Sequence, residues 1–161
     1  NITLHEGADF KLGAVQIGGG TQNLEIITTV THAEPKATSS QIVRSVLAGT
    51  ATGTYLGKVA VARDAQLTDS VQSVKAMLLD RSATANAKPE LEIYADDVKC
   101  AHGCAIGELD AMGLFYLQAR GIAPADAKKL MLQAFVAGVF ESAADEDILI
   151  EAALKKLGEL V

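Results

Sequence analysis

The sequence contains no tryptophan, and aromatic residues make up only 4% of its 161 residues. A core built on large aromatic side chains is therefore excluded, and small and aliphatic side chains are expected to pack in short, repetitive layers. Basic residues are also few, since 14 Lys and Arg stand against 20 Asp and Glu, for a formal net charge of −6. Because phosphate groups bind to basic surfaces, this balance argues against a nucleic-acid partner.

Cysteines and long apolar runs are scarce as well. On an extended strand, the only two cysteines, Cys100 and Cys104, would lie about 13 Å apart, whereas a disulfide needs Cα atoms within about 7 Å. We therefore expect free thiols in a reducing compartment. No apolar run approaches the roughly 18 residues of a transmembrane helix, so no membrane partner is expected. The chain opens at Asn1 within a strand-like pattern, which suggests a fragment of a longer protein whose strands continue before it.

Residues 1–107 are predicted to form short β-strands. Apolar and polar residues alternate with period two, which places one face of a strand inside and the other outside. The residues of one face in these runs are Leu24, Ile26, Thr28, Val30; Tyr55, Gly57, Val59, Val61; Leu91, Ile93; and Val98, Cys100, His102, Cys104, Ile106. Turn or loop chemistry lies between them, at Gly18–Gly20, Glu34-Pro35, Gly49-Thr50, Thr52-Gly53 and Lys88-Pro89. The pattern fits either a hairpin sandwich or a parallel β-helix. The absence of Asn-Gly and Asp-Gly hairpin signals favours the β-helix.

The remaining residues, 108–161, are predicted to form a helical domain. Asp110 is a suitable N-cap for the first helix, whose stripe of Leu114, Leu117 and Phe115 should be buried, and Gly121 follows it as a C′ residue. Pro124 suits the first position of a second helix that extends through 125–141. A third helix is expected to start at the acidic residues 145–147 and to end near Lys155 and Lys156, in agreement with the helix macrodipole.

The candidate functional residues lie on the strand before this domain. Cys100, His102 and Cys104 share one strand face, and thiolate and imidazole are ligands that iron–sulfur clusters and soft metals use. Ligands at i and i+2 lie about 6.6 Å apart, which one metal can span, whereas the residue at i+4 is too far away. The strand therefore offers at most two ligands. From spacing alone, the plainer alternative is favoured, in which these are small inward-facing residues of a core strand.

Other candidates are weaker. His5 and His32 are expected to be ordinary strand residues. A group of acidic residues consists of Glu90, Glu92, Asp96 and Asp97. These carboxylates could hold a hard cation, but they are more typical of a solvated strand face and turn. The glycines of 18–20 lack the Lys and Ser/Thr of a P-loop, so no nucleotide site is expected. No Ser/His/Asp order and no carboxylate pair suggests a catalytic residue.

A longer block of sequence carries a family resemblance. Residues 88–103, which end in the motif Lys-Cys-Ala-His-Gly, are similar to SufD-type members of the SufB/SufD family of iron–sulfur cluster assembly scaffolds, in the SUF system. The similarity continues through 107–122 and covers about residues 77–123 without a gap, and the flanks match more loosely. Two residues depart from the family pattern. Cys104 replaces a small residue without a thiol, and Gly113 replaces a helix-favouring residue.

The resemblance implies a fold and a function. The fold is a right-handed parallel β-helix over residues 1–107, followed by a helical domain over 108–161. The function is that of a non-catalytic scaffold that pairs with SufB through the β-helix and with the ATPase SufC through the helical tail. His102 and Cys100 match the functional motif, so they are implied to hold a nascent cluster shared with SufB, while the chain alone is not expected to retain one.

Several alternatives stay open at this point. Without SufB, two copies of the chain could form a homodimer. A purely structural β-solenoid adaptor and a β-helix carbohydrate-active enzyme are the competing functions. The family occurs in the bacterial cytoplasm, which is the expected location here, and in the plastid stroma.

Overall fold

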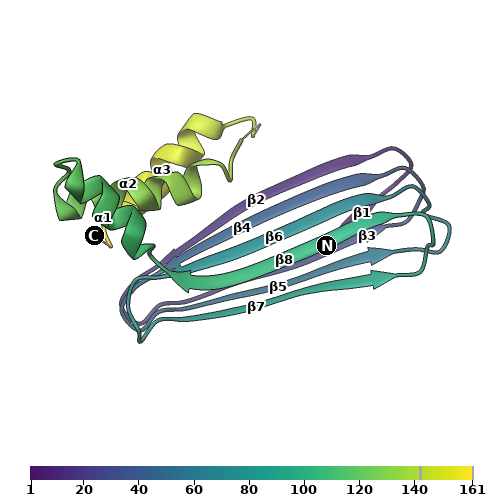
Figure 1. Ribbon diagram of the computed structural model, residues 1–161. Coiled ribbons are helices and arrows are strands. Elements are labelled where there is room, and N and C mark those ends of the chain that lie inside the picture. Colours follow the sequence, from purple (N-terminus) through teal and green to yellow (C-terminus); the bar gives the residue numbers. More distant parts are fainter. Residues whose placement is uncertain (142, 161) are drawn as a thin grey trace.

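The computed structural model describes residues 1–141 and 143–160, and in these ranges eight strands form two parallel four-stranded sheets followed by three helices (Figure 1). One sheet, called sheet A, has the order β1 (Ile2–Leu4), β3 (Asn23–His32), β5 (Thr52–Val61), β7 (Thr84–Ile93). The other, sheet B, has the order β2 (Asp9–Gly18), β4 (Thr38–Leu47), β6 (Asp69–Leu78), β8 (Lys99–Glu108). The chain alternates between the sheets and therefore winds as a solenoid.

Each strand pairs in parallel with the strand one coil later. In sheet B, Asp9 aligns with Thr38, Thr38 with Asp69, and Asp69 with Lys99, so a coil takes 29 to 31 residues. Every strand pair in the described part of the chain is parallel. A sandwich of hairpins would require antiparallel neighbours. The predicted parallel β-helix is therefore confirmed, and the sandwich is excluded.

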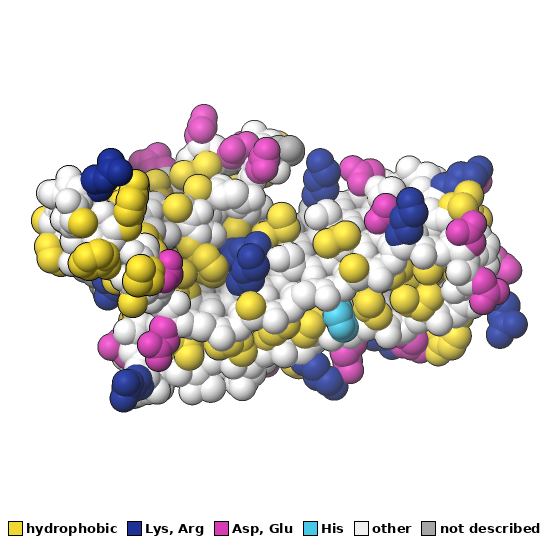
Figure 2. Space-filling model, in the orientation of Figure 1, with side chains coloured by type: hydrophobic (Ala, Val, Ile, Leu, Met, Phe, Trp, Pro, Cys, Tyr) yellow, Lys and Arg dark blue, Asp and Glu magenta, His cyan; other side chains and the backbone are white. Residues whose placement is uncertain are grey.

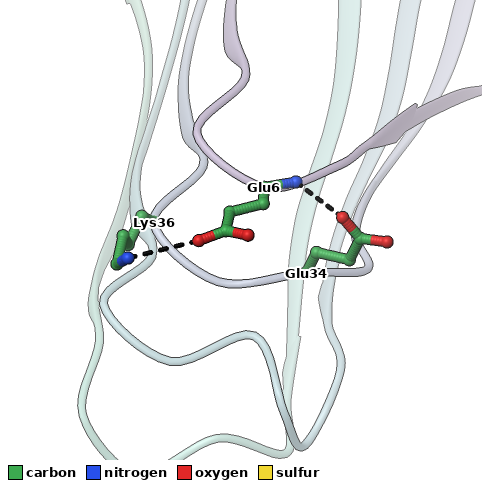
Figure 3. Close-up of polar contacts among 3 residues, drawn as sticks. All are labelled: Glu6, Glu34 and Lys36. Atoms are coloured by element: carbon green, nitrogen blue, oxygen red, sulfur yellow. Dashed lines mark hydrogen bonds and ion pairs between the residues drawn. The ribbon is translucent and has the colours of Figure 1, made fainter.

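The turns between strands stack in the same way as the strands. Glu6 N–H donates to Glu34 Oε2 at 2.8 Å, and Lys36 Nζ lies 3.2 Å from Glu6 Oε1, which links two successive coils (Figure 3). The Glu6 N–H is the main reason that the pKa of the Glu34 carboxyl is lowered. Gly7, Lys36 and Leu67 adopt left-handed φ angles of 68°, 62° and 61°. Two non-glycine residues thus accept a strained backbone so that the turns match.

Two of the predicted turns are wrong. Thr52 and Gly53 begin β5, where Gly53 faces the interior and an added Cβ would lie 2.9 Å from Leu47 Cδ1. Lys88 and Pro89 lie within β7. Proline is tolerated there because β7 is the last described strand of sheet A, and an edge strand does not need every N–H for pairing.

A hydrogen-bonded polar cluster interrupts the aliphatic interior. Gln72 Nε2 donates to Tyr55 OH at 2.9 Å, and the same hydroxyl lies 3.0 Å from Thr28 Oγ1. Gln41 Oε1 accepts from Gln72 Nε2 at 3.4 Å. Gly57 provides the necessary space, because an added Cβ would overlap the Tyr55 hydroxyl. Burial raises the pKa of Tyr55, so its hydroxyl stays protonated and can donate.

A second polar row contains the buried histidine. His32 Nε2 lies 2.9 Å from Ser39 Oγ, which lies 2.8 Å from Ser70 Oγ. The His32 side chain is fully enclosed, with an exposed fraction of 0%. Burial disfavours the imidazolium and lowers the pKa of His32, against a weaker opposing effect of the Ala37 backbone.

The helices form a tail on the outer face of sheet B, and none of those described is long and apolar enough to cross a membrane. They are α1 (Ala111–Ala119), α2 (Pro124–Ala137) and α3 (Glu146–Gly158). Helices α2 and α3 bury Leu132, Val136 and Leu157 against Val46 of β4. Of the range 108–161 predicted as a helical domain, residues 142 and 161 lie outside the described residues.

Helix boundaries agree with the sequence signals more closely than helix faces do. Asp110 caps α1 by accepting from the N–H groups of residues 112 and 113, each at 3.0 Å. Gly121 has a left-handed φ of 86°, and Pro124 begins α2, as predicted. However, α2 ends at Ala137 and not at 141. Phe115 was predicted to be buried but is 66% exposed, and α1 contributes no buried residue at all.

Gly113 fits close packing between α1 and α2. A Cβ added at Gly113 would lie 2.9 Å from Met131 Cε of α2. The glycine thus leaves room for the end of the Met131 side chain, at a cost of about 1 kcal/mol relative to alanine within a helix.

We expect Gly13→Ala to destabilise the chain by about 1–3 kcal/mol, as overpacking does. Gly13 lies on β2, and an added Cβ would overlap the carbonyl oxygen of Val139, which follows α2. The measurement is thermal unfolding, combined with hydrogen exchange of the helices. Gly103→Ala is the control, because nothing lies within 4 Å of a Cβ there. Equal melting temperatures for the two variants would contradict direct packing of the tail on β2.

The buried histidine predicts how stability depends on pH. Because the folded-state pKa of His32 is below its ordinary value of 6.5, the unfolded chain binds more protons and stability rises with pH. The contribution of His32 should be constant above the unfolded pKa and should decline as the pH falls toward the lower folded pKa. Denaturant unfolding at stepped pH should show a shallower decline in stability for His32→Gln than for the wild type. A wild-type slope for His32→Gln would disprove the assignment.

Candidate functional site

The candidate residues lie at an open end of the solenoid. Strand β8 pairs with β6 on one side, and no described strand pairs with its other side. The same is true of β7 beyond β5. Consequently every residue of β8 except Cys100 is exposed, whereas the inward residues of β6 are buried. The interior of the solenoid is therefore accessible at this end.

The strand register places the three ligand candidates in the interior columns. Cys100 aligns with Ser70, His102 with Gln72, and Cys104 with Val74. The partners in β6 face inward, so the three β8 residues share the inward face, as the alternation predicted.

Sharing a face does not bring the three candidates into one site. No group of three His, Cys, Asp or Glu residues in the described chain is close enough to hold a metal ion.

Cys100 is half-buried and chemically restrained. It packs against the buried cluster that includes Val61 and Ala95. Burial first, and then the charge of Asp69, raise the pKa of the Cys100 thiol, while the backbone N–H of Ser70 opposes them. At neutral pH the thiol is protonated, so it becomes a thiolate ligand only when a metal displaces the proton.

His102 and Cys104 are both exposed at the open end. Within the described chain, His102 makes no hydrogen bond or ion pair, so both ring nitrogens are accessible to a partner or a metal. Cys104 is a free thiol above the apolar Val74. Of the two candidates in the family motif, Cys100 and His102, His102 is thus the more accessible.

Three of the other sequence candidates, Glu90, Glu92 and His5, have ion-pair partners. Glu92 pairs with Lys58 and accepts a hydrogen bond from Tyr94, and the Lys58 contact is the main cause of its lowered pKa. Glu90 lies 2.9 Å from Lys88. These carboxylates form a solvated, ion-paired outer face of sheet A. His5 Nδ1 pairs with Glu34 at 3.2 Å, at the opposite end of the strands from the helical tail.

Sequence reasoning missed the polar stack beneath His102. Gln41 and Gln72 occupy consecutive positions of the column that ends in His102. Both are nearly fully enclosed, with exposed fractions of 0% and 1%. The sequence did contain an indication of this stack, because both glutamines occupy strand positions whose side chains alternate inward, and they are 31 residues apart. Only the register shows that they lie in one column with His102.

Comparisons with known proteins show the family to which the chain belongs. Residues 1–135 match the family described as SUF system FeS cluster assembly, SufBD core domain. The iron-sulfur cluster assembly protein SufD of Escherichia coli is 34% identical over 154 residues, covering 96% of this chain and 36% of that protein. An iron-sulfur cluster assembly SufBD family protein of Synechocystis is 35% identical over 80% of this chain and 28% of its own length.

A plant relative extends the range of hosts. The chloroplastic protein ABCI7 of Arabidopsis thaliana is 36% identical over 81% of this chain and 28% of its own length. The chain thus spans about a third of the length of these relatives. With a family match over most of its length and the solenoid that the motif implied, the chain belongs to the SufBD core family of SUF iron–sulfur cluster assembly proteins.

Proposed function

We propose that this chain is the part of a SufD-type scaffold subunit that presents one edge of a nascent iron–sulfur cluster site. The observation that carries the proposal is the position of His102, exposed at the open end of the solenoid within the motif matching the family. The chain contributes binding groups and no catalytic residue. The proposed setting is the bacterial cytoplasm first and the plastid stroma second, and one relative, ABCI7 of Arabidopsis thaliana, is named as chloroplastic.

The open end supports pairing with SufB. Strands β7 and β8 both present an unpaired edge in the described chain, and such an edge can pair with a strand of another protein. Pro89 removes one donor from β7, so β8 is the more complete template of the two. SufB is the proposed occupant, and a second copy of this chain is the alternative when SufB is absent.

The ligand count explains why the site is shared. Cys100 and His102 are two candidate ligands, whereas a cluster commonly takes four. SufB would supply the remaining ligands across the paired edge. Contact with iron would also displace the proton that burial retains on Cys100. No cluster role is proposed for Cys104, which departs from the family motif.

The helical tail supports docking of the ATPase SufC. We define the α1 patch as Met112, Phe115 and Tyr116, which are 73%, 66% and 57% exposed. Figure 2 shows hydrophobic side chains gathered over the helical end of the molecule. An apolar helix with no buried residue is typical of a surface that a partner covers. On α2, Leu132 and Val136 pack on sheet B, while Leu130 is 47% exposed, so part of the apolar stripe of α2 also remains for a partner.

The competing functions have less support. A carbohydrate-active β-helix enzyme would need unpaired carboxylates on an exposed groove, whereas Glu90 and Glu92 are paired with lysines. A purely structural adaptor would need no accessible imidazole at the solenoid end. It differs from the scaffold in one measurable respect, the effect of removing that imidazole.

His102→Ala is expected to lower cluster yield in the assembled complex with SufB and SufC without dissociating it, because Ala can neither ligate iron nor transfer a proton. Since His102 is exposed, the stability change should be small, about 1 kcal/mol or less. Iron and sulfide are counted after anaerobic reconstitution, and complex size is measured in parallel.

The matched control is His5→Ala, which removes another exposed histidine far from the open end. It should retain wild-type cluster yield. An unchanged yield in His102→Ala would favour the structural adaptor. We also expect Cys100→Ser to lower the yield less than His102→Ala does.

Phe115→Ser should weaken SufC binding by about 2 kcal/mol or more, roughly 30-fold, if the α1 patch is the centre of that interface. Binding is measured by calorimetry or co-purification with SufC. Ile148→Ser on α3 is the control, because Ile148 is 67% exposed but lies outside the patch. Equal affinity of both variants would place the SufC surface elsewhere.

A further inference from the structure

Gln72 has one side-chain atom without a partner in the interior. Its Nε2 donates to Tyr55 OH at 2.9 Å and to Gln41 Oε1 at 3.4 Å. Its Oε1 is buried and accepts no hydrogen bond from any described residue. A buried amide oxygen without a donor destabilises the fold, so such an atom in a native interior suggests a donor that is supplied elsewhere.

The next residue in the same column is His102. The register pairs Gln72 with His102 across β6 and β8, and parallel neighbours lie about 4.8 Å apart. His102 is exposed at the open end, and an imidazole always carries at least one N–H. No hydrogen bond or ion pair in the described chain holds the imidazole in place, so its side chain is able to rotate relative to the column below. Gln72 therefore lacks a donor, and the residue above it has a donor without an acceptor.

We propose that Gln72 is a positioning residue, whose Oε1 accepts a hydrogen bond from the His102 imidazole. This bond would hold one ring nitrogen as N–H and leave the other deprotonated and directed to the open end, where it can bind iron. Ligand histidines usually have such an acceptor on the second nitrogen, which fixes the tautomer. The inference rests on the proposed function only in assigning a purpose to the orientation.

The polar cluster described above makes Gln72 a rigid acceptor. Tyr55 OH holds its Nε2, and Thr28 in turn holds Tyr55 OH. Gly57 leaves no side chain between them, and a Cβ there would overlap both Tyr55 OH and Gln72 Nε2. With Nε2 fixed on this side, the amide plane is fixed and Oε1 has a defined direction. The buried cluster would thus transmit a fixed geometry to the outermost coil.

The tautomer of His102 tests the proposal directly. The chain contains three histidines, so long-range ¹H–¹⁵N spectra of the metal-free, uniformly labelled protein can be assigned with single variants. In a solvent-exposed histidine the two tautomers form a mixture. We expect the ratio of the two His102 tautomers to differ from the ratio in that mixture by about fivefold or more, which is what one net hydrogen bond supplies. Gln72→Leu should abolish this preference, and Gln72→Glu, which keeps an acceptor, should retain it.

Gln16→Leu is the matched control. Gln16 is 4% exposed and hydrogen-bonded in the interior, where it accepts from Ser45 and donates to the Thr54 carbonyl. It lies outside the His102 column, so its replacement should cost comparable stability but leave the tautomer preference intact. If both leucine variants abolish the preference, the effect comes from a loosened core and the proposal is overturned.

The wild-type spectrum alone can also overturn the proposal. An unbiased tautomer mixture at His102 would exclude the hydrogen bond even if Gln72→Leu failed to fold. The result is separable from the proposed function. If His102→Ala leaves cluster yield unchanged, the ligand role fails while the measured tautomer preference stands. If the ligand role holds but the tautomer is unbiased, only the inference about Gln72 fails.

Discussion

In-register stacking of parallel coils is the constraint on which the rest of this structure depends. Each inward side chain lies directly above its counterpart one coil earlier, so the interior is a set of columns and not a freely packed core. Polar residues in such a column can satisfy one another, as Ser39 and Ser70 do. The same constraint forces the turns to superimpose, and Lys36 and Leu67 adopt left-handed backbone for that reason.

The outer face of sheet B follows a different rule from the interior. There the side chains need no counterpart a coil away, and Val46 serves instead as the platform for α2 and α3. Gly13 brings the chain after α2 into contact with the strand backbone itself. The tail is thereby fixed to the early coils of the solenoid, while α1 follows directly from β8 and keeps its apolar surface uncovered. The two proposed partner surfaces thus begin at the same strand.

Local chemistry in the sequence predicted much of this fold. Period-two alternation located strand faces, and Asp110 and Pro124 located helix starts, because capping depends on adjacent residues. The choice between sandwich and solenoid needed the family resemblance, since strand pairing joins residues about 30 positions apart. Pro89 was misjudged because its tolerance depends on the position of β7 in the sheet. The shared face of Cys100 and His102 was predictable, but the glutamine beneath His102 was not, because register is not a local property.

The unpaired edge of β8 has a thermodynamic consequence. A protein that binds the folded coil but not the unfolded chain stabilises it by mass action, by about 2.7 kcal/mol when its concentration is one hundred times the dissociation constant. The last coil has the most exposed strand of the solenoid and therefore the least interior packing of its own. If the proposed partner binds this edge, the order of the coil, and with it the geometry around His102, depends on the partner concentration. Folding of this coil and binding of the proposed partner would then form one linked equilibrium.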